Sequence, residues 1–157
     1  HYPYPVIRMA EMYLNLAEIL IELDALENTT GRLEEAKGLI DKIRVRAGIP
    51  TIDEAWKKAN HPEKANTAEG LREIVRRERQ IEFYLENQRF WDLRRWKDAG
   101  ILGEKVWGMN IEGDTDETFF VPTELQNIRT FKQAQYLMPI PMTETNKVPH
   151  IVQNPGY

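Results

Sequence analysis

Two glutamates one helical turn apart, Glu78 and Glu82, are the residues of this sequence whose type and spacing allow catalysis. On one face of a helix, the carboxyl groups at i and i+4 lie close to the separation of about 5–5.5 Å that a retaining glycosidase needs. Such an enzyme also needs one carboxyl group whose pKa is raised by an apolar pocket. The spacing therefore allows a glycoside hydrolase that uses this pair.

The surrounding segment favours a structural role for both glutamates. Residues 76–96 hold six arginines, four acids and five aromatic residues. Nearby guanidinium groups favour the ionised form of a carboxyl group, and an unpaired charge on the apolar stripe between Val75 and Ile81 would be costly. We therefore predict an ion-pair network, and expect Glu82→Gln to destabilise the fold. The arginines available as partners are Arg79, Arg89, Arg94 and Arg95.

Other catalytic classes find no support in the composition. The 157 residues include no cysteine, which excludes thiol nucleophiles, disulfides and cysteine-based zinc sites within this chain. They also include no serine, which excludes Ser-His-Asp sites. The histidines at positions 1, 61 and 150 are too scattered for an H-E-x-x-H zinc motif. We expect no enzymatic activity, no metal and no cofactor.

The charge is small and evenly spread. The 21 basic and 25 acidic residues give a formal net charge of −4, and no basic cluster indicates binding to nucleic acid or to anionic lipid. No apolar run approaches the roughly 18 residues of a transmembrane helix. Because the sequence starts at His1 without a methionine, we expect that the amino-terminal part of a longer protein, with any targeting signal, is missing.

The elements that must position these residues are mainly helices. Residues 8–26 are apolar over most of a helical circumference, which is typical of a helix buried between neighbours. A second helix is predicted over 32–47, so that residues 8–47 form a tetratricopeptide-like hairpin. Since one hairpin cannot cover both faces of its first helix, further helices must pack on it. The polar residues of that first helix form one narrow stripe: Arg8, Glu11, Asn15, Glu18 and Glu22.

Beyond the hairpin, the helical signal continues and then fades. We predict a short helix over 53–60 and a longer one over 67–85, the latter after an Asn66-x-x-Glu69 start signal. From residue 97 onward glycines and prolines interrupt the pattern, and short extended pieces are predicted at 119–121 and 135–138. The predicted fold class is mostly α, with a tetratricopeptide-like hairpin, further helices over 53–98, and an irregular segment with short strands over 99–157.

The irregular segment holds candidate ligand contacts, since aromatic side chains stack on sugar rings and amides bind hydroxyl groups. The alternative is that the same side chains only seal the loop onto the helices. Trp91 and Trp96 are predicted to be core residues instead. The acidic run over 112–117 does not match a calcium loop, because Phe119 stands where the loop requires glycine. The candidates are Trp107, Asn110, Phe119, Phe120 and Tyr136.

Five sequence blocks carry a family resemblance. In chain order they are RMAEMYLNLAEILIEL, IDKIRVRAGIP, ERQIEFYLENQRFWDLRRW, YLMPIP and QNPGY. Together they resemble the carboxy-terminal region of SusD/RagB proteins, the outer-membrane nutrient-binding lipoproteins of Bacteroidetes. In that family the ER…E…R…DLRRW signature supports the fold rather than binding ligand. It falls here on Glu78, Arg79, Glu82, Arg89, Asp92, Leu93, Arg94, Arg95 and Trp96.

The resemblance implies a mostly helical protein at the cell surface, held in the outer membrane by a lipid anchor that would precede this chain. It implies non-catalytic capture of oligosaccharides and their delivery to a SusC-like TonB-dependent transporter, with no nucleic acid partner. The family's ligand-contacting aromatic residues come largely from sequence before this region. Two alternatives stay open: a tetratricopeptide-type scaffold that binds a protein partner, and a glycoside hydrolase using Glu78 and Glu82.

Overall fold

The structure of the chain is a computed structural model that describes residues 7–125, 129–148 and 150–157. Within these residues the secondary structure is mainly helical, with one two-stranded sheet, which confirms the predicted fold class. The chain divides into a first unit, residues 1–89, and a second unit, residues 90–157. None of the helices in the described ranges is long and apolar enough to cross a membrane.

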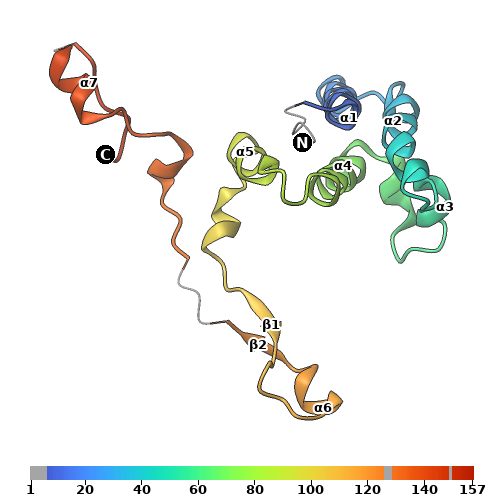
Figure 1. The fold of residues 1–157 in the computed structure, drawn as a ribbon. Helices are drawn as coiled ribbons and strands as arrows, with labels where there is room; N and C mark the ends of the chain where they lie inside the picture. The colour runs from blue at the N-terminus through green and yellow to red at the C-terminus, as the bar shows by residue number, and fades with distance from the viewer. Residues whose placement is uncertain (1–6, 126–128, 149) are drawn as a thin grey trace, which may run out of the picture. The chain divides into compact units, whose positions relative to one another are not determined.

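The first unit begins with the predicted helical hairpin. Helix α1 (Met9–Glu27) and helix α2 (Leu33–Arg46) pack against each other (Figure 1). The connection turns at Asn28, whose φ of 51° is the left-handed conformation that asparagine tolerates better than most residues. Both helices therefore lie where the periodicity predicts them, within one or two residues at each end.

A buried aspartate closes this turn. The Asp24 side chain is fully buried and accepts hydrogen bonds from Thr29 Oγ1 at 2.7 Å, Arg32 N at 2.8 Å and Arg32 Nη1 at 2.9 Å. Burial opposes ionisation of this carboxyl group. The hydrogen bonds and the Arg32 charge outweigh burial, so the pKa of Asp24 lies below its usual value of 3.8.

Asp24→Asn should destabilise the protein at neutral pH, because the amide cannot accept all the hydrogen bonds that the carboxylate accepts. A carboxyl group whose pKa is lower in the folded state stabilises the fold at any pH above its unfolded-state pKa. This stabilisation is lost as the pH falls through the folded-state pKa. The difference in unfolding free energy between wild type and variant should therefore shrink below pH 3.8. Urea denaturation over a pH series measures it, with the exposed Asp114→Asn as control; a pH-independent difference contradicts the prediction.

Helix α3 (Ile52–Trp56), the 3₁₀ turn η1 (Pro62–Asn66) and helix α4 (Ala68–Glu82) complete the first unit. Helix α4 starts one residue later than the Asn66 signal predicts. Asn66 ends η1, and Thr67 caps α4 by accepting a hydrogen bond from Gly70 N at 3.1 Å. Helix α3 is shorter than the predicted 53–60 helix.

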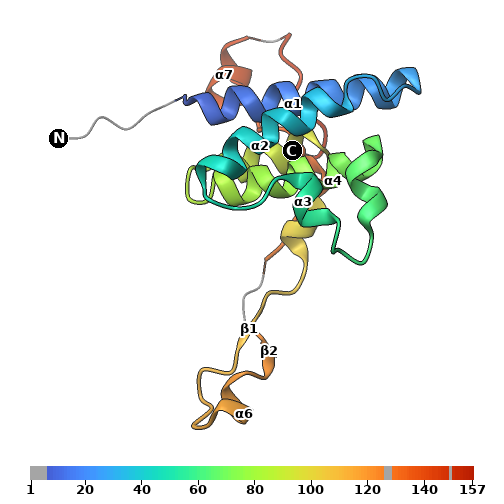
Figure 2. The ribbon, with the colours of Figure 1, turned by 90° about the vertical axis from the view of Figure 1, so that its right-hand side faces the viewer.

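The core of the first unit lies where α1 crosses α2 and α4 (Figure 2). Its fully buried side chains include Leu14, Ile21, Ile40, Leu71 and Val75. The opposite face of α1 stays exposed and apolar, with side chains 37% to 79% accessible, as expected for a helix that needs further partners. We call this the outer face of α1; it consists of Met9, Met12, Leu16, Ile19, Leu23 and Leu26.

The second unit contains most of helix α5 (Gln88–Arg95), followed by short elements. Strands β1 (Trp107–Met109) and β2 (Pro122–Glu124) pair antiparallel, with Trp107 opposite Glu124 and Met109 opposite Pro122 (Figure 1). The remaining elements are η2 (Ala99–Gly103), α6 (Asp116–Phe119), η3 (Gln133–Tyr136) and α7 (Met142–Lys147).

Both predicted extended pieces are wrong, although short strands do occur. The Thr115 cap starts a helical turn that runs through Phe119, so residues 119–121 do not form a strand. At 135–138, the Gln135 side chain accepts a hydrogen bond from Lys132 N at 2.6 Å and closes the 3₁₀ turn η3. Side-chain caps thus outweigh the weak extended propensity of both segments.

Candidate functional site

Glu78 forms an ion pair, but with an arginine outside the predicted set. Glu78 is buried, and Arg44 Nη1 from α2 donates to its Oε1. Arg44 Nε also donates to Pro50 O at 2.7 Å, so the guanidinium joins α4 to the loop between α2 and α3. The arginines near Glu78 in sequence do not supply this contact, because the buried stripe of α4 faces the neighbouring helices.

Glu82 is held by two arginines from other segments. Arg46 Nη2 donates to Glu82 Oε1 at 2.6 Å, and Arg8 Nη1 reaches the same oxygen. Arg8 also donates to Glu86 at 2.9 and 2.7 Å. Burial opposes ionisation of Glu82, but its hydrogen bonds and charge interactions with Arg8 and Arg46 outweigh burial and lower its pKa. Glu82 is therefore an ionised ion-pair partner and lacks the raised pKa of a catalytic acid.

The polar stripe of α1 supplies partners for two arginines of α4. Buried Arg79 donates to Asn15 Oδ1 at 2.6 Å and lies 3.9 Å from Glu18. Arg72 binds Glu22 with two hydrogen bonds of 2.5 and 2.6 Å. Sequence reasoning missed Arg44, Arg46 and Arg72 as partners. The available signal was the stripe itself, since polar residues inside an apolar surface require partners.

The rest of the signature lies in or just after α5. Arg89 is in its first turn; Asp92 accepts from Arg95 Nε at 2.9 Å, and the Arg95 guanidinium lies 4.8 Å from the Trp96 ring centre. Arg94 stacks on Phe90, 4.9 Å from the ring centre. These contacts pair charged side chains of α5 with one another and with aromatic rings of the same segment.

The predicted core position of Trp91 is wrong. Its side chain is 53% exposed, while Leu93 is buried and Trp96 is half-buried. Residues two apart on a helix point to nearly opposite sides, so burying Leu93 turns Trp91 towards solvent.

Four of the five candidate ligand contacts lie on one hairpin, formed by β1, α6 and β2. Trp107 is 60% exposed and Phe120 is 61% exposed. Phe119 packs edge-to-face on Phe120 with ring centres 5.2 Å apart. At the base of the hairpin Lys105 binds Glu124 at 2.6 Å, across the sheet from Trp107. The hairpin therefore presents exposed aromatic rings next to charged groups.

Asn110 organises the loop of this hairpin. Its Nδ2 donates to Thr118 O at 3.1 Å, and its Oδ1 accepts from Glu112 N at 3.3 Å. Gly113 packs so closely that a Cβ there would lie 2.5 Å from Phe119 N. The Asn110 amide thus fixes the backbone that carries both phenylalanines.

Tyr136, the fifth candidate, belongs to η3. Its hydroxyl donates to Lys97 O at 2.6 Å, the Lys97 ammonium lies 4.7 Å from its ring centre, and Phe131 packs on it at 4.9 Å. These contacts join η3 to Lys97, just after α5, and to neighbouring Phe131. The structure gives Tyr136 no contact with the four hairpin candidates among its described residues.

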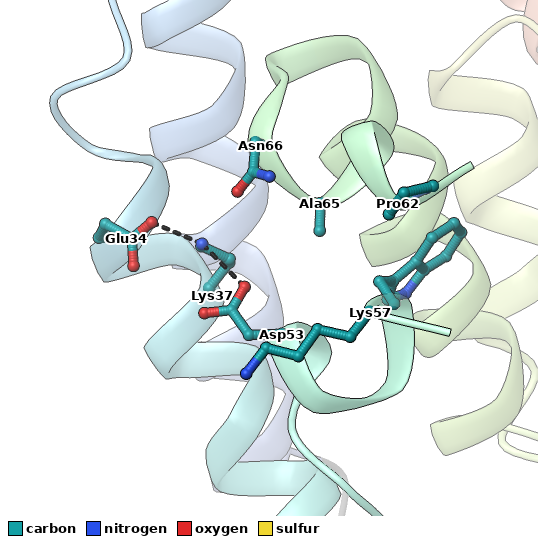
Figure 3. Close-up of a pocket in the computed structure, with 8 residues that line it drawn as sticks. Glu34, Lys37, Asp53, Lys57, Pro62, Ala65 and Asn66 are labelled. Carbon is teal, nitrogen blue, oxygen red and sulfur yellow. Dashed lines mark hydrogen bonds and ion pairs between the residues drawn. The ribbon is translucent and has the colours of Figure 1, made fainter. Parts of the chain in front are cut away.

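The first unit contains a cavity of about 380 Å³ that sequence reasoning missed. Figure 3 shows it between α2, α3 and η1, with Lys37 bonded to Glu34 and Asp53. Within the described ranges, no three His, Cys, Asp or Glu side chains are grouped so that they could hold a metal ion.

Comparison with known proteins places these features in a family. The profile of the SusD family matches residues 1–157. SusD-like protein P2 of Formosa agariphila is 30% identical over 161 residues, which cover 98% of this chain and 26% of that protein. The chain thus spans about a quarter of this relative.

Solved structures agree with this match. The structure of BT4246 has a TM-score of 0.80 and 32% identity, over 99% of this chain and 25% of that one. A SusD-like protein from Bacteroides fragilis, BF3747, has a TM-score of 0.71 and 36% identity, over 99% of this chain and 28% of that one. The similarity therefore extends over nearly all of this chain and about a quarter of each solved structure.

Proposed function

Because this chain belongs to the SusD family, we propose that it is part of a non-catalytic protein that captures oligosaccharides at the cell surface. The protein passes its ligand to a SusC-like TonB-dependent transporter and is held in the outer membrane by an amino-terminal lipid anchor. The observation that carries this proposal is the family match over residues 1–157. Within this chain, the hairpin aromatics are the candidate ligand contacts.

The state of the signature glutamates supports a binding role over hydrolysis. Glu78 is paired with Arg44 and Glu82 with Arg8 and Arg46. A retaining glycosidase requires one carboxyl group protonated near neutral pH, whereas the pKa of Glu82 is lowered. Glycoside hydrolysis by this pair is therefore disfavoured by the same contacts that stabilise the fold.

Calorimetry of the full-length protein against a panel of oligosaccharides and peptides tests the proposal. We expect saturable binding of at least one oligosaccharide, and chromatography of the same mixtures should recover it uncleaved. Release of shorter sugars, or absence of binding to every oligosaccharide in the panel, would count against a non-catalytic glycan-binding role.

Trp107→Ala and Phe120→Ala in the full-length protein should each weaken oligosaccharide binding about tenfold, since truncating an aromatic contact at a binding surface commonly costs more than ~1 kcal/mol. Folding should be unaffected, because both side chains are mostly exposed. Calorimetry measures the affinities. Tyr84→Ala, which removes an aromatic side chain 75% exposed in the first unit, is the control. Unchanged affinity in both hairpin variants would exclude the hairpin as a ligand contact.

A tetratricopeptide-type scaffold is the second candidate because of the outer face of α1. Its six exposed apolar side chains follow a three-and-four spacing, which suits packing against another helix. This face equally suits a further hairpin of the same protein. The scaffold alternative predicts binding of a protein partner and none of the oligosaccharide binding described above.

A further inference from the structure

The cavity of the first unit contains a buried ammonium group with spare donor capacity. The Lys37 side chain is 5% exposed and donates to Glu34 Oε1 at 2.5 Å and to Asp53 Oδ1 at 3.0 Å (Figure 3). An ammonium group has three N–H donors, and no residue in the described part of the chain accepts the third. Lys37 lines the cavity, so this donor is available to a ligand.

The charges around the cavity balance. Lys37 and Lys57 are positive, and Glu34 and Asp53 are negative, so the four charged residues of the lining sum to zero. Burial opposes the charge of Lys37, but Glu34 and Asp53 outweigh burial and raise its pKa, so the ammonium stays charged. An anionic ligand at the third Lys37 donor would be repelled by the neighbouring Glu34 and Asp53 carboxylates. A neutral ligand with hydroxyl groups meets no such repulsion.

The remaining lining supplies an apolar wall and a free amide. Half-buried Trp56 and exposed Pro62 provide apolar surface. Asn66 lies across the cavity from Lys57 (Figure 3), and its exposed amide has no hydrogen-bond partner among the residues that the structure describes. An amide can both donate to and accept from a hydroxyl group. The lining thus combines an apolar wall with an amide, two carboxylates and an ammonium group. Such a lining suits a compact polyol that has one apolar face.

We propose that this cavity, lined by Lys37, Asp53, Trp56 and Asn66, binds one unit of a neutral sugar, separately from the hairpin aromatics. The apolar face of the sugar ring packs on Trp56, while its hydroxyl groups bond the Lys37 ammonium, an Asp53 oxygen and the Asn66 amide. About 380 Å³ is enough for one such ring. This site goes beyond the proposed function, and it can exist whether or not the hairpin binds glycan.

Proton–nitrogen NMR of the full-length protein, titrated with glucose, galactose, mannose and xylose, tests the proposal. We expect at least one sugar to shift the Trp56 indole and Asn66 amide signals saturably, and glucuronate to bind more weakly than that sugar. Trp56→Phe identifies the indole signal. Asn66→Ala should weaken binding about fivefold, the usual effect of one lost hydrogen bond. Asn60→Ala, an exposed asparagine outside the lining, is the matched control.

The proposal would be overturned by no shift with any of the four sugars, by tighter binding of glucuronate, or by unchanged affinity in Asn66→Ala. Trp107→Ala should leave this titration unaltered, so the outcome is independent of the hairpin. Loss of binding in both Asn66→Ala and Asn60→Ala, with an intact spectrum, would also contradict it, because the effect would not be specific to the lining.

Discussion

Gly70→Ala is expected to lower the unfolding free energy of the protein by about 3 kcal/mol or more, although it adds one methyl group. A Cβ at Gly70 would lie 2.2 Å from Lys64 O and 2.5 Å from Lys64 Cα. These are backbone atoms of η1, so no side-chain rotation relieves the overlap. Either η1 moves away from α4 or the first turn of α4 unwinds, and both changes expose buried surface.

Gly38→Ala is the matched control for this substitution. Gly38 lies within α2, and a Cβ there would meet nothing within 4 Å. Alanine is favoured over glycine inside a helix by about 0.5–1 kcal/mol, so this variant should be more stable than wild type. Urea denaturation followed by circular dichroism measures both. Equal stability of Gly70→Ala and wild type would show that η1 is not packed as closely as described.

Glu78→Ala is expected to cost about 3–5 kcal/mol, because it leaves the Arg44 guanidinium largely buried without its carboxylate. The side chains of Arg44 and Glu78 are only 12% and 10% exposed. Replacing both partners with apolar residues, Arg44→Met with Glu78→Leu, should recover most of the loss, since no charge is then left unpaired. Urea denaturation of Arg44→Met, Glu78→Leu and the double variant gives the coupling free energy.

The control for the ion pair is Glu73→Gln in the same helix. Glu73 pairs with Lys64, but its side chain is 58% exposed, and exposed ion pairs contribute little to stability. If Glu73→Gln lowers the unfolding free energy as much as Glu78→Ala does, the cause is loss of a negative charge from α4 and not burial of the ion pair. A double variant less stable than either single variant would contradict the unpaired-charge explanation.

The helices of the first unit could be predicted because helical periodicity is a local property. The apolar and polar positions of residues 8–26 define α1 and its polar stripe without reference to any other segment. The pattern also predicts that other helices pack on α1, and its exposed apolar outer face agrees with this. Which arginine pairs with which acid is not a local property. The partners of Arg8, Arg72 and Arg79 could be identified only in the folded chain.

The residue types of the candidate ligand contacts could be predicted from the sequence, but their positions relative to one another could not. Exposed aromatic residues in an irregular segment could be found by reading the chain. The pairing of Trp107 with Glu124 depends on hairpin register, which the caps and the Asn110 loop decide. The cavity beside Lys37 had no sequence signal, because it forms where α2, α3 and η1 meet.

By itself, the sequence determined the mostly helical fold class, the ion-paired character of Glu78 and Glu82, and the resemblance to the SusD/RagB family. Only the tertiary structure decided that Glu78 meets Arg44, 34 residues away, rather than an arginine of its own segment. The physical reason is that hydrophobic periodicity sets which face of a helix is buried. The packing of one helix on another sets which charges meet there and where a cavity remains.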